Sequence, residues 1–243
     1  MGLAGKTTLI IGGGTGIGAG CALAFAEAGA TVAISGRRLD KLQATAAKFT
    51  GNPGIQCHAG DVSVREQARE LIDWATRTLG RIDIMINCAG INIPKRTMRD
   101  LDPADWDKLL LVNATGAFNA MHYVMPQMRE RQDGLIINVS SVAGVRASVL
   151  GGVAYSASKF AMTALGTTVA VEEKNSGIRI TNVYPGEVET PILDARPVPV
   201  SAEHRAKILQ PEDIASVLVA IAQLPPRAHV AELVIKPTTQ EFI

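Results

Sequence analysis

Short apolar runs alternate with helical patterns along the whole chain. The runs, such as Thr8-Leu9-Ile10-Ile11, are apolar at nearly every position rather than at every second one. Each is followed by a turn and by a stretch whose apolar residues recur at helical spacing. Strands of this kind are usually parallel and buried on both faces. The pattern therefore predicts an α/β fold, a doubly wound sheet of about seven parallel strands with helices on both faces.

The same pattern predicts where the elements lie. We expect strands at 8–11, 31–34, 55–59, 82–86, 135–139, 178–183 and 230–235, and, after a helix that follows the first strand, helices at 39–49, 64–79, 103–130, 155–173 and 211–223. The stretch after the sixth strand is rich in proline and irregular. Because ligands bind at the carboxyl ends of parallel strands, we expect a substrate loop at about 186–209 within a single domain covering 1–243.

Composition and charge narrow the function classes. Lys and Arg total 24 against 23 for Asp and Glu, and a net charge of +1 argues against a nucleic-acid partner. The three cysteines form no C-x-x-C pair, which favours a reducing cytoplasm, and the four scattered histidines predict no metal site. No signal peptide and no apolar stretch of about 20 residues is apparent, so we expect a cytoplasmic protein without a membrane span.

A glycine-rich loop follows the first predicted strand. Residues 12–18 read Gly-Gly-Gly-Thr-Gly-Ile-Gly, and Gly12, Gly16 and Gly18 have the spacing Gly-x-x-x-Gly-x-Gly. Glycine lets a phosphate approach the backbone, and the helix that begins here offers free N–H groups to an anion. The alternative is a merely tight strand–helix turn. The candidate phosphate-binding residues are Gly12, Gly14, Thr15, Gly16, Ile17 and Gly18.

Two further segments are candidates for the nucleotide end of a dinucleotide. A carboxylate after the second strand typically binds the ribose of NAD(H), whereas an arginine accommodates the 2′-phosphate of NADP(H). Arg37 and Arg38 follow that strand and no acid occurs before Asp40, so we expect NADP(H), with NAD(H) as the alternative. Alternatively, both arginines could lie at the start of a helix without binding a ligand. Asp61-Val62 follows the third strand and is expected to hold an adenine, although Asp61 could equally cap a helix.

A set of polar side chains suits proton transfer. Tyr155 and Lys159 are four residues apart and share one helix face, where an ammonium lowers the pKa of a phenol. Ser140 and Ser141 end the fifth strand, at the edge where ligands bind. Asn113 lies inside an apolar helical stretch, where an amide is mildly unfavourable; it could also be a satisfied core amide.

Taken together, these residues resemble the short-chain dehydrogenase/reductase family over essentially the whole chain, and the resemblance implies a Rossmann fold. The matching motifs are Gly12-x-x-x-Gly16-x-Gly18, Asp61, Asn87-Cys88-Ala89-Gly90, Asn113, Ser141, Tyr155-x-x-x-Lys159 and Pro185-Gly186-x-Val188-x-Thr190. The resemblance implies that Tyr155 is the general acid–base, that Lys159 lowers its pKa and holds the ribose, that Ser141 binds the substrate oxygen and that Asn113 holds a water. It also implies that Val188 and Thr190 meet the nicotinamide amide, and that Asn87, Ala89 and Gly90 line the cofactor cleft. Pro185 and Gly186 belong to the same cofactor-binding motif.

The resemblance implies an NADP(H)-dependent oxidoreductase that interconverts a carbonyl and a secondary alcohol, either 3-oxoacyl reductase-like or a general ketone or hydroxy-acid reductase. The alternatives are an inactive cofactor-binding regulator and a nucleotide-sugar epimerase or dehydratase. Ser141 precedes Tyr155 by 14 residues, one more than is usual in the family, so Ser140 is a competitor for its role.

The substrate and the assembly are the least specified. Expected pocket residues are Val142, Val145, Arg146, Val149, Leu150, Ile192 and Leu193. Arg96 or Arg146 could meet an acidic substrate group, or could be solvated. Relatives pair through two long helices, which implies a homo-oligomer, a tetramer, and the apolar run Phe160, Ala161, Leu165 and Val169 supports that expectation.

Overall fold

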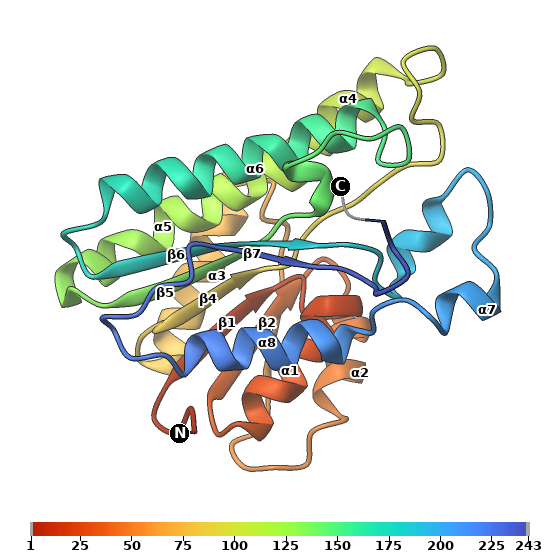
Figure 1. Ribbon diagram of the computed structural model, residues 1–243. Helices are drawn as coiled ribbons and strands as arrows, with labels where there is room; N and C mark the ends of the chain where they lie inside the picture. The colour runs from red at the N-terminus through yellow and green to blue at the C-terminus, as the bar shows by residue number, and fades with distance from the viewer. Residues whose placement is uncertain (1, 242–243) are drawn as a thin grey trace.

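The computed structural model describes residues 2–241, and a single parallel sheet of seven strands organises them (Figure 1). The strand order is β3-β2-β1-β4-β5-β6-β7, and every neighbouring pair is parallel. The strands are β1 (Thr7–Ile11), β2 (Thr31–Gly36), β3 (Gln56–Ala59), β4 (Ile84–Asn87), β5 (Gly134–Val139), β6 (Ile178–Pro185) and β7 (Glu232–Ile235). The predicted fold class is confirmed.

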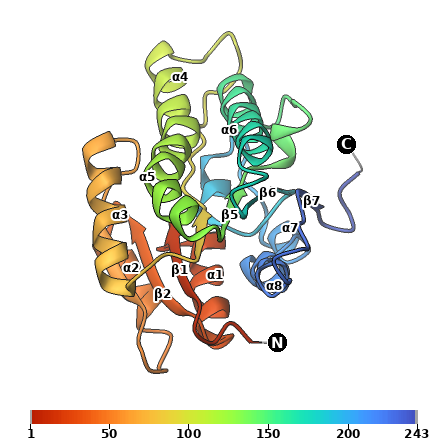
Figure 2. The ribbon, with the colours of Figure 1, turned by 90° about the vertical axis from the view of Figure 1, so that its left-hand side faces the viewer.

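Helices cover both faces of the sheet (Figure 2). They are α1 (Gly16–Glu27), α2 (Leu39–Ala46), α3 (Arg65–Leu79), α4 (Pro103–Leu110), α5 (Gly116–Arg131), α6 (Val153–Glu172), α7 (Ala202–Arg205) and α8 (Pro211–Ala222). Helices α1 and α8 pack on one face, and α3, α5 and α6 pack on the other. In the part of the chain that the structure describes, none of them has the length and apolar character needed to span a membrane.

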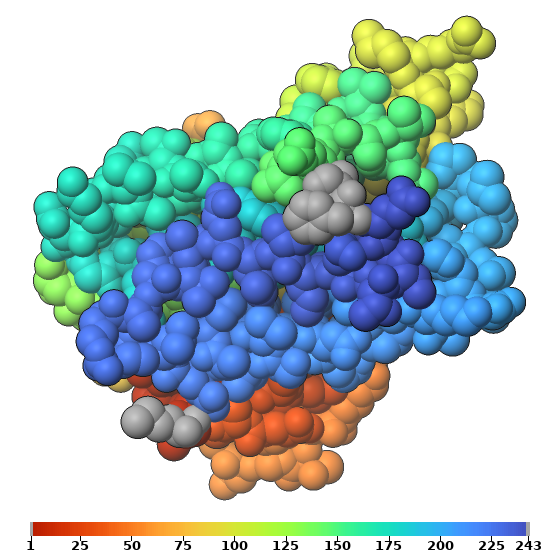
Figure 3. Space-filling view, viewed as in Figure 1, coloured from red at the N-terminus to blue at the C-terminus, as the bar shows by residue number. Residues whose placement is uncertain are grey.

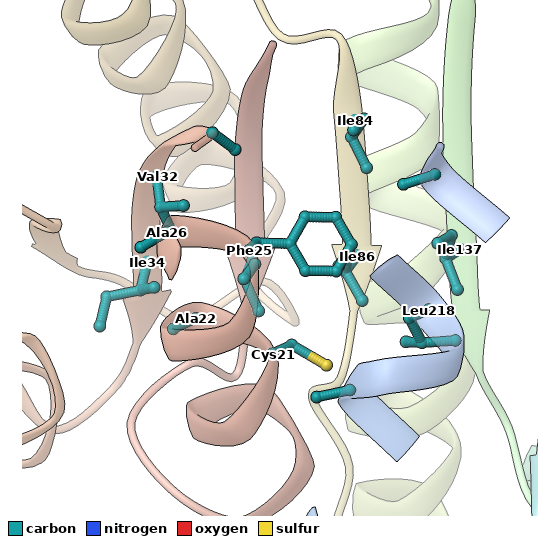
Figure 4. Close-up of a cluster of buried hydrophobic side chains, with 14 of the residues drawn as sticks. Cys21, Ala22, Phe25, Ala26, Val32, Ile34, Ile84, Ile86, Ile137 and Leu218 are labelled. Carbon is teal, nitrogen blue, oxygen red and sulfur yellow. The ribbon is translucent and has the colours of Figure 1, made fainter. Parts of the chain in front are cut away.

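This two-sided cover explains why the strands are apolar at nearly every position. In β1, Ile10 packs with α1 and α8, whereas Leu9 and Ile11 pack with the helices of the other face. Figure 4 shows the first of these clusters, with Phe25 of α1 directed at β4, where Ile86 lies. Side chains alternate along a strand, so both faces need apolar residues when both are covered.

The edge strands do not follow the rule for the central ones. In β3, Gln56 and Ala59 are exposed, and in β7 Val234 is 48% exposed. The expectation of apolar strands buried on both faces is therefore wrong at the two edges, where each strand has one neighbour and incomplete cover. Figure 3 shows α8, β7 and the segment that follows β7 on one face, between α1 and α6.

Most predicted boundaries lie within two residues of the observed ones, and three segments differ more. The second helix ends at Ala46 rather than at 49, because Phe49 packs against the core from the turn that follows. The helical stretch 103–130 is interrupted by a π-helical segment, Leu111–Thr115. The loop 186–209 contains a 3₁₀ segment, Pro191–Ala195, and the short helix α7.

Candidate functional site

A cavity of about 740 Å³ lies at the carboxyl ends of the strands. Its walls come from the segments that follow β1, β2, β3, β4, β5 and β6, from the start of α6 and from the C-terminal segment. Of the residues predicted from the sequence, the cavity is lined by Gly12, Gly14, Thr15, Gly16, Ile17, Gly18, Arg37, Arg38, Asp61, Val62, Ala89, Gly90, Ser141, Tyr155, Lys159, Pro185, Gly186, Val188 and Thr190. The topology thus brings together, at one edge of the sheet, predicted residues that are spread along the chain from Gly12 to Thr190.

The glycine loop is packed too closely for side chains. A Cβ on Gly18 would lie 2.2 Å from the carbonyl oxygen of Gly12, and one on Gly12 would lie 2.7 Å from the backbone nitrogen of Ala89. Helix α1 begins at Gly16, its N-cap Thr15 makes no side-chain capping bond, and its first turn carries no acid. The first N–H groups of α1 therefore face the cavity in an arrangement that fits a phosphate.

Positive charge gathers at the end of β2. Arg37 and Arg38 line the cavity, and Lys41, on the first turn of α2, joins them. Lys41 was missed from the sequence; its position three residues after Arg38, on the same helix face, was the available signal. This wall fits an anionic group on a nucleotide.

Asp61 forms a turn beside this wall. Its Oδ1 accepts hydrogen bonds from the Ser63 backbone N–H at 2.9 Å and from the Ser63 hydroxyl at 2.6 Å. The N-cap of α3 is Val64, so the interpretation of Asp61 as the helix N-cap is wrong. Strand β3 ends at Ala59, and Asp61 and Val62 follow it by two and three residues.

Tyr155 and Lys159 lie on the first turns of α6 and line the cavity. The Lys159 Nζ donates to the Val139 carbonyl at 3.0 Å and lies 5.8 Å from the centre of the Tyr155 ring. Burial lowers the pKa of Lys159 to about 8. Burial also raises the pKa of the Tyr155 phenol, against the effects of the Ser141 hydrogen bond and the Arg96 charge. The expectation of a lowered phenol pKa is therefore wrong here, because desolvation outweighs the neighbouring charges.

The two serines point in different directions. The Ser141 hydroxyl lies close enough to the Tyr155 phenol to oppose the rise of its pKa that burial causes, and it accepts from the Ala143 N–H at 3.1 Å. The Ser140 hydroxyl is buried and donates to the Lys159 carbonyl at 3.1 Å. The geometry therefore favours Ser141 over Ser140 as the partner of Tyr155. The additional residue between Ser141 and Tyr155 falls in a loop that ends at Gly152, whose φ of 85° suits glycine.

Asn113 lies in the π-helical segment and is fully buried. Its Oδ1 accepts from the Ile91 N–H at 2.8 Å, and its Nδ2 donates to the Ile91 carbonyl at 3.0 Å and to the Ser158 hydroxyl at 2.9 Å. Its side chain therefore fixes the loop after β4 instead of lining the cavity. The core-amide interpretation describes these contacts, and π-helical segments are frequent at functional sites.

Asn87 is also placed differently from the expectation. Its Nδ2 donates to Asn138 Oδ1 at 2.7 Å, and Asn138 in turn donates to Asn182 at 3.4 Å. These three asparagines occupy one register position across β4, β5 and β6. Asn87 therefore joins the strands beneath the cavity and does not line it, because a buried amide must be hydrogen-bonded and its partners lie within the sheet.

The substrate side of the cavity is formed by three loops. Of the expected pocket residues, Val142, Arg146, Leu150, Ile192 and Leu193 line it, whereas Val145 and Val149 do not. Arg96 also lines it, is only 6% exposed, and donates hydrogen bonds to the carbonyls of Ile93, Leu150 and Ala195. The interpretation of Arg96 as a solvated arginine is therefore wrong, since tertiary contacts bury it.

The C-terminal segment completes the cavity. Gln240 and Glu241 line it, and Gln240 Oε1 accepts from the Glu187 backbone N–H at 3.1 Å. The Lys236 ammonium holds this segment by donating to the Gln240 carbonyl at 2.6 Å. No sequence pattern indicated this contribution, because it depends on how the chain turns after β7. Among residues 2–241, no three His, Cys, Asp or Glu side chains are gathered in a way that could hold a metal ion.

Comparison with known proteins agrees with this geometry. The family model described as short chain dehydrogenase matches residues 6–198. The 3-oxoacyl-[acyl-carrier-protein] reductase FabG of Thermotoga maritima is 34% identical over 228 residues, covering 91% of this chain and 92% of that protein. Glycine betaine reductase ATRR of Emericella nidulans is also 34% identical, over 97% of this chain, but the match spans only 19% of that much longer protein.

Solved structures of other proteins also have a similar fold. A 3-ketoacyl-(acyl-carrier-protein) reductase from Brucella melitensis complexed with NADH superposes with a TM-score of 0.87 at 26% identity, covering 96% of this chain and 98% of that one. An alcohol dehydrogenase from Thermococcus sibiricus complexed with 5-hydroxy-NADP gives 0.87 at 25% identity, covering 98% and 99%. This chain belongs to the short-chain dehydrogenase family and is an oxidoreductase of that family.

Proposed function

We propose that this protein is an NADP(H)-dependent oxidoreductase that interconverts a carbonyl and a secondary alcohol. The observation that carries the proposal is the cavity itself, in which the glycine cradle and Tyr155, Ser141 and Lys159 share one continuous space. The cradle is packed too closely for a Cβ at Gly12 or Gly18, and the first turn of α1, which could bind a phosphate, lines the cavity. The polar side chains line the same cavity, where they could bind a reacting oxygen. One ligand can therefore reach from the cradle to the tyrosine.

The residues divide into those that hold the cofactor and those that handle a proton. A nicotinamide dinucleotide, when bound, supplies or accepts the hydride. Its phosphates fit the N-terminal turn of α1, and Lys159 is placed to donate to ribose hydroxyls. Val188 and Thr190 follow β6 on the same wall and are assigned to the nicotinamide end, while Asp61 and Val62 are assigned to the adenine.

The Tyr155 hydroxyl delivers the proton to the carbonyl oxygen during reduction and removes it during oxidation. The Ser141 hydroxyl holds that oxygen. Burial raises the pKa of the phenol, which favours its protonated form, the form that acts as the acid. Asn113 keeps the loop at Ile91 in place, and since its side-chain amide is committed there, we assign any water-holding role to its main chain.

The preference for NADP(H) over NAD(H) rests on charge. Three cations, Arg37, Arg38 and Lys41, line the wall that follows β2, and a planar guanidinium suits a phosphate. The Ser35 hydroxyl is buried and does not line the cavity, so it does not contribute to this choice.

A panel of ketones, oxo acids and oxoacyl thioesters tests the proposal. The purified protein is mixed with NADPH or NADH, and oxidation of the cofactor is followed at 340 nm. Substrate-dependent oxidation, faster with NADPH, is the expected result. Tight cofactor binding without turnover of any member would instead favour a cofactor-binding regulator.

We also propose a cytoplasmic homo-oligomer, a tetramer, in which each chain acts as one domain with residues 186–209 as its substrate loop. Support for assembly comes from apolar side chains exposed on the long helices: Leu111 at 45%, Phe118 at 43% and Phe160 at 41%. Leu165 and Val169, by contrast, pack against the core. Light scattering tests the proposal, and a mass near 25.6 kDa at micromolar concentration would contradict it.

A further inference from the structure

We propose that the substrate of this enzyme carries a carboxylate that binds Arg96, so that the reaction interconverts an oxo acid and a hydroxy acid. This inference rests on the proposed function and specifies its substrate class. It follows from the contacts of one buried cation and from the charges that surround it.

Arg96 is held rigidly by neutral groups. Its Nε donates to the Ile93 carbonyl at 2.8 Å, Nη1 donates to the Leu150 carbonyl at 2.8 Å, and Nη2 donates to the Ala195 carbonyl. These acceptors come from the loop after β4, the loop before α6 and the 3₁₀ segment after β6. A guanidinium fixed from three sides loses little further freedom when a ligand binds, and is therefore pre-organised.

Two of the five N–H groups of Arg96 remain available. The three bonds account for Nε and for one N–H on each terminal nitrogen. The second N–H of Nη1 and that of Nη2 have no acceptor among residues 2–241, although the side chain is buried and lines the cavity. Buried donors are normally satisfied, and a planar carboxylate suits the two terminal nitrogens of a guanidinium.

The charge of Arg96 is also uncompensated. None of the ion pairs within the described chain includes Arg96. The Glu187 carboxylate, which lines the cavity after β6, is engaged by Arg196 at 3.2 Å and by His204 at 2.6 Å. Arg146 lines the same region without an ion pair. Of the other two acids on the cavity wall, Glu241 is exposed and Asp61, which follows β3, accepts hydrogen bonds from Ser63. Burying a cation without a counter-ion is costly, and an anionic substrate group would remove that cost.

Arg96 lies close to the reacting position. Its Nε donates to the carbonyl of Ile93, and Ile93 belongs to the apolar cluster on which Tyr155 packs. Burial raises the pKa of the Tyr155 phenol, and the Arg96 charge opposes part of that rise. A short oxo acid could therefore place its carbonyl at Tyr155 and its carboxylate at Arg96. In the reduction, the carbonyl carbon gains the hydride, its oxygen gains the Tyr155 proton, the reduced nicotinamide becomes oxidised, and the carboxylate is unchanged.

The test compares 2-, 3- and 4-oxo acids with their own methyl esters, which keep the oxo group and lack the negative charge. For the wild type we expect kcat/KM for the best acid to exceed that for its ester by at least about tenfold. Arg96→Gln should lower the value for the acid by at least about 30-fold, the usual scale for breaking a buried charged pair, and should change that for the ester by less than about threefold. Arg96→Lys should retain part of the preference.

Lys95→Gln is the matched control, because Lys95 is the neighbouring residue, carries the same charge and is exposed outside the cavity. It should behave as wild type. An ester that is reduced as well as its acid by the wild type would overturn the inference without any variant. So would an equal loss of both activities in Arg96→Gln, since Arg96 would then only join the loops.

A binding measurement separates this inference from the proposed function. Calorimetry follows the binding of the matching hydroxy acids and their esters to the protein with oxidised cofactor, in wild type and Arg96→Gln. Acid binding that depends on Arg96, without turnover, would sustain the inference and reject the proposed function. Reduction of neutral ketones without any preference for acids would support the proposed function and reject the inference. If the protein showed no binding of the acids and no turnover, both would be rejected.

Discussion

The two ends of the cavity are built by different means. The cofactor end is formed by backbone atoms. Gly12 and Gly18 pack so closely that no side chain fits, and the first N–H groups of α1 face the cavity. The substrate end is formed by side-chain contacts. Arg96 joins three loops through hydrogen bonds, and Glu187 forms ion pairs with Arg196 and His204. A backbone cradle accepts the phosphates of any dinucleotide, whereas a surface of side chains can be changed residue by residue to select a substrate.

Loss of the phenol hydroxyl should produce the largest change in turnover. Tyr155→Phe removes the proton donor while keeping the ring that packs on Ile93 and Leu109. We expect kcat to fall by about 10²–10⁴-fold, with cofactor affinity within about threefold of wild type, because the cradle is untouched. Steady-state kinetics and cofactor titration measure the two quantities. Turnover within a factor of about two of wild type would remove Tyr155 from the mechanism.

A single methyl group in the cradle should damage the cofactor end selectively. In Gly18→Ala the new Cβ would lie 2.2 Å from the Gly12 carbonyl oxygen, so the loop must shift. We expect cofactor affinity to fall by about 100-fold and the melting temperature to drop by several degrees. Gly54→Ala is the control, since nothing lies within 4 Å of a Cβ there. Normal cofactor binding by Gly18→Ala would show that the cradle is not the phosphate site.

A smaller effect is expected where side chains contribute to the cofactor end. Arg37→Ala should lower kcat/KM with NADPH by about tenfold, the scale of one charged hydrogen bond, and leave the NADH value nearly unchanged. Lys48→Ala, an exposed cation of the neighbouring turn that lies outside the cavity, is the control. A wild type that prefers NADH, or a preference unchanged in Arg37→Ala, would overturn the assignment.

The last expected effect is on stability rather than on catalysis, and it depends on pH. The pKa of Lys159 falls from an ordinary value near 10.5 to about 8 on folding. Between these pH values the unfolded chain binds more protons, so the wild type should gain stability as the pH rises, by at most about 3 kcal/mol. Lys159→Met lacks this gain. Urea unfolding of both proteins at pH 7.5, 8.5 and 9.5 measures the difference, and parallel pH profiles would contradict the buried, shifted amine.

The contrast between the two ends also explains what could be predicted from the sequence. The strands, the glycine loop, and the positions of Ser141, Tyr155 and Lys159 depend on local pattern and on where a strand ends, and these were predicted. The burial of Arg96 depends on carbonyls 3, 54 and 99 residues away in the chain, so no local signal could indicate it.

Two asparagines show the same limit of prediction from local sequence. Asn87 was expected at the cavity, but its amide is taken by Asn138, which shares its register on the neighbouring strand. Asn113 was expected to hold a water, but its amide is committed to the backbone of Ile91. The sequence positions of these two asparagines indicated a role near the site. The partners of their amides are set by tertiary packing and could not be predicted. The contribution of Gln240 and Glu241 likewise depends on the path of the chain after β7.

Direct transfer of hydrogen from the cofactor tests the central claim of an oxidoreductase acting through this cavity. The protein is incubated with NADPH that carries deuterium at both hydrogen positions of the nicotinamide C4 and with the best carbonyl compound of the panel, and the product is examined by NMR. We predict one deuterium on the carbinol carbon of the product alcohol, formed by the wild type and lost with Tyr155→Phe. An alcohol without deuterium at that carbon, or equal formation by Tyr155→Phe, would contradict the account.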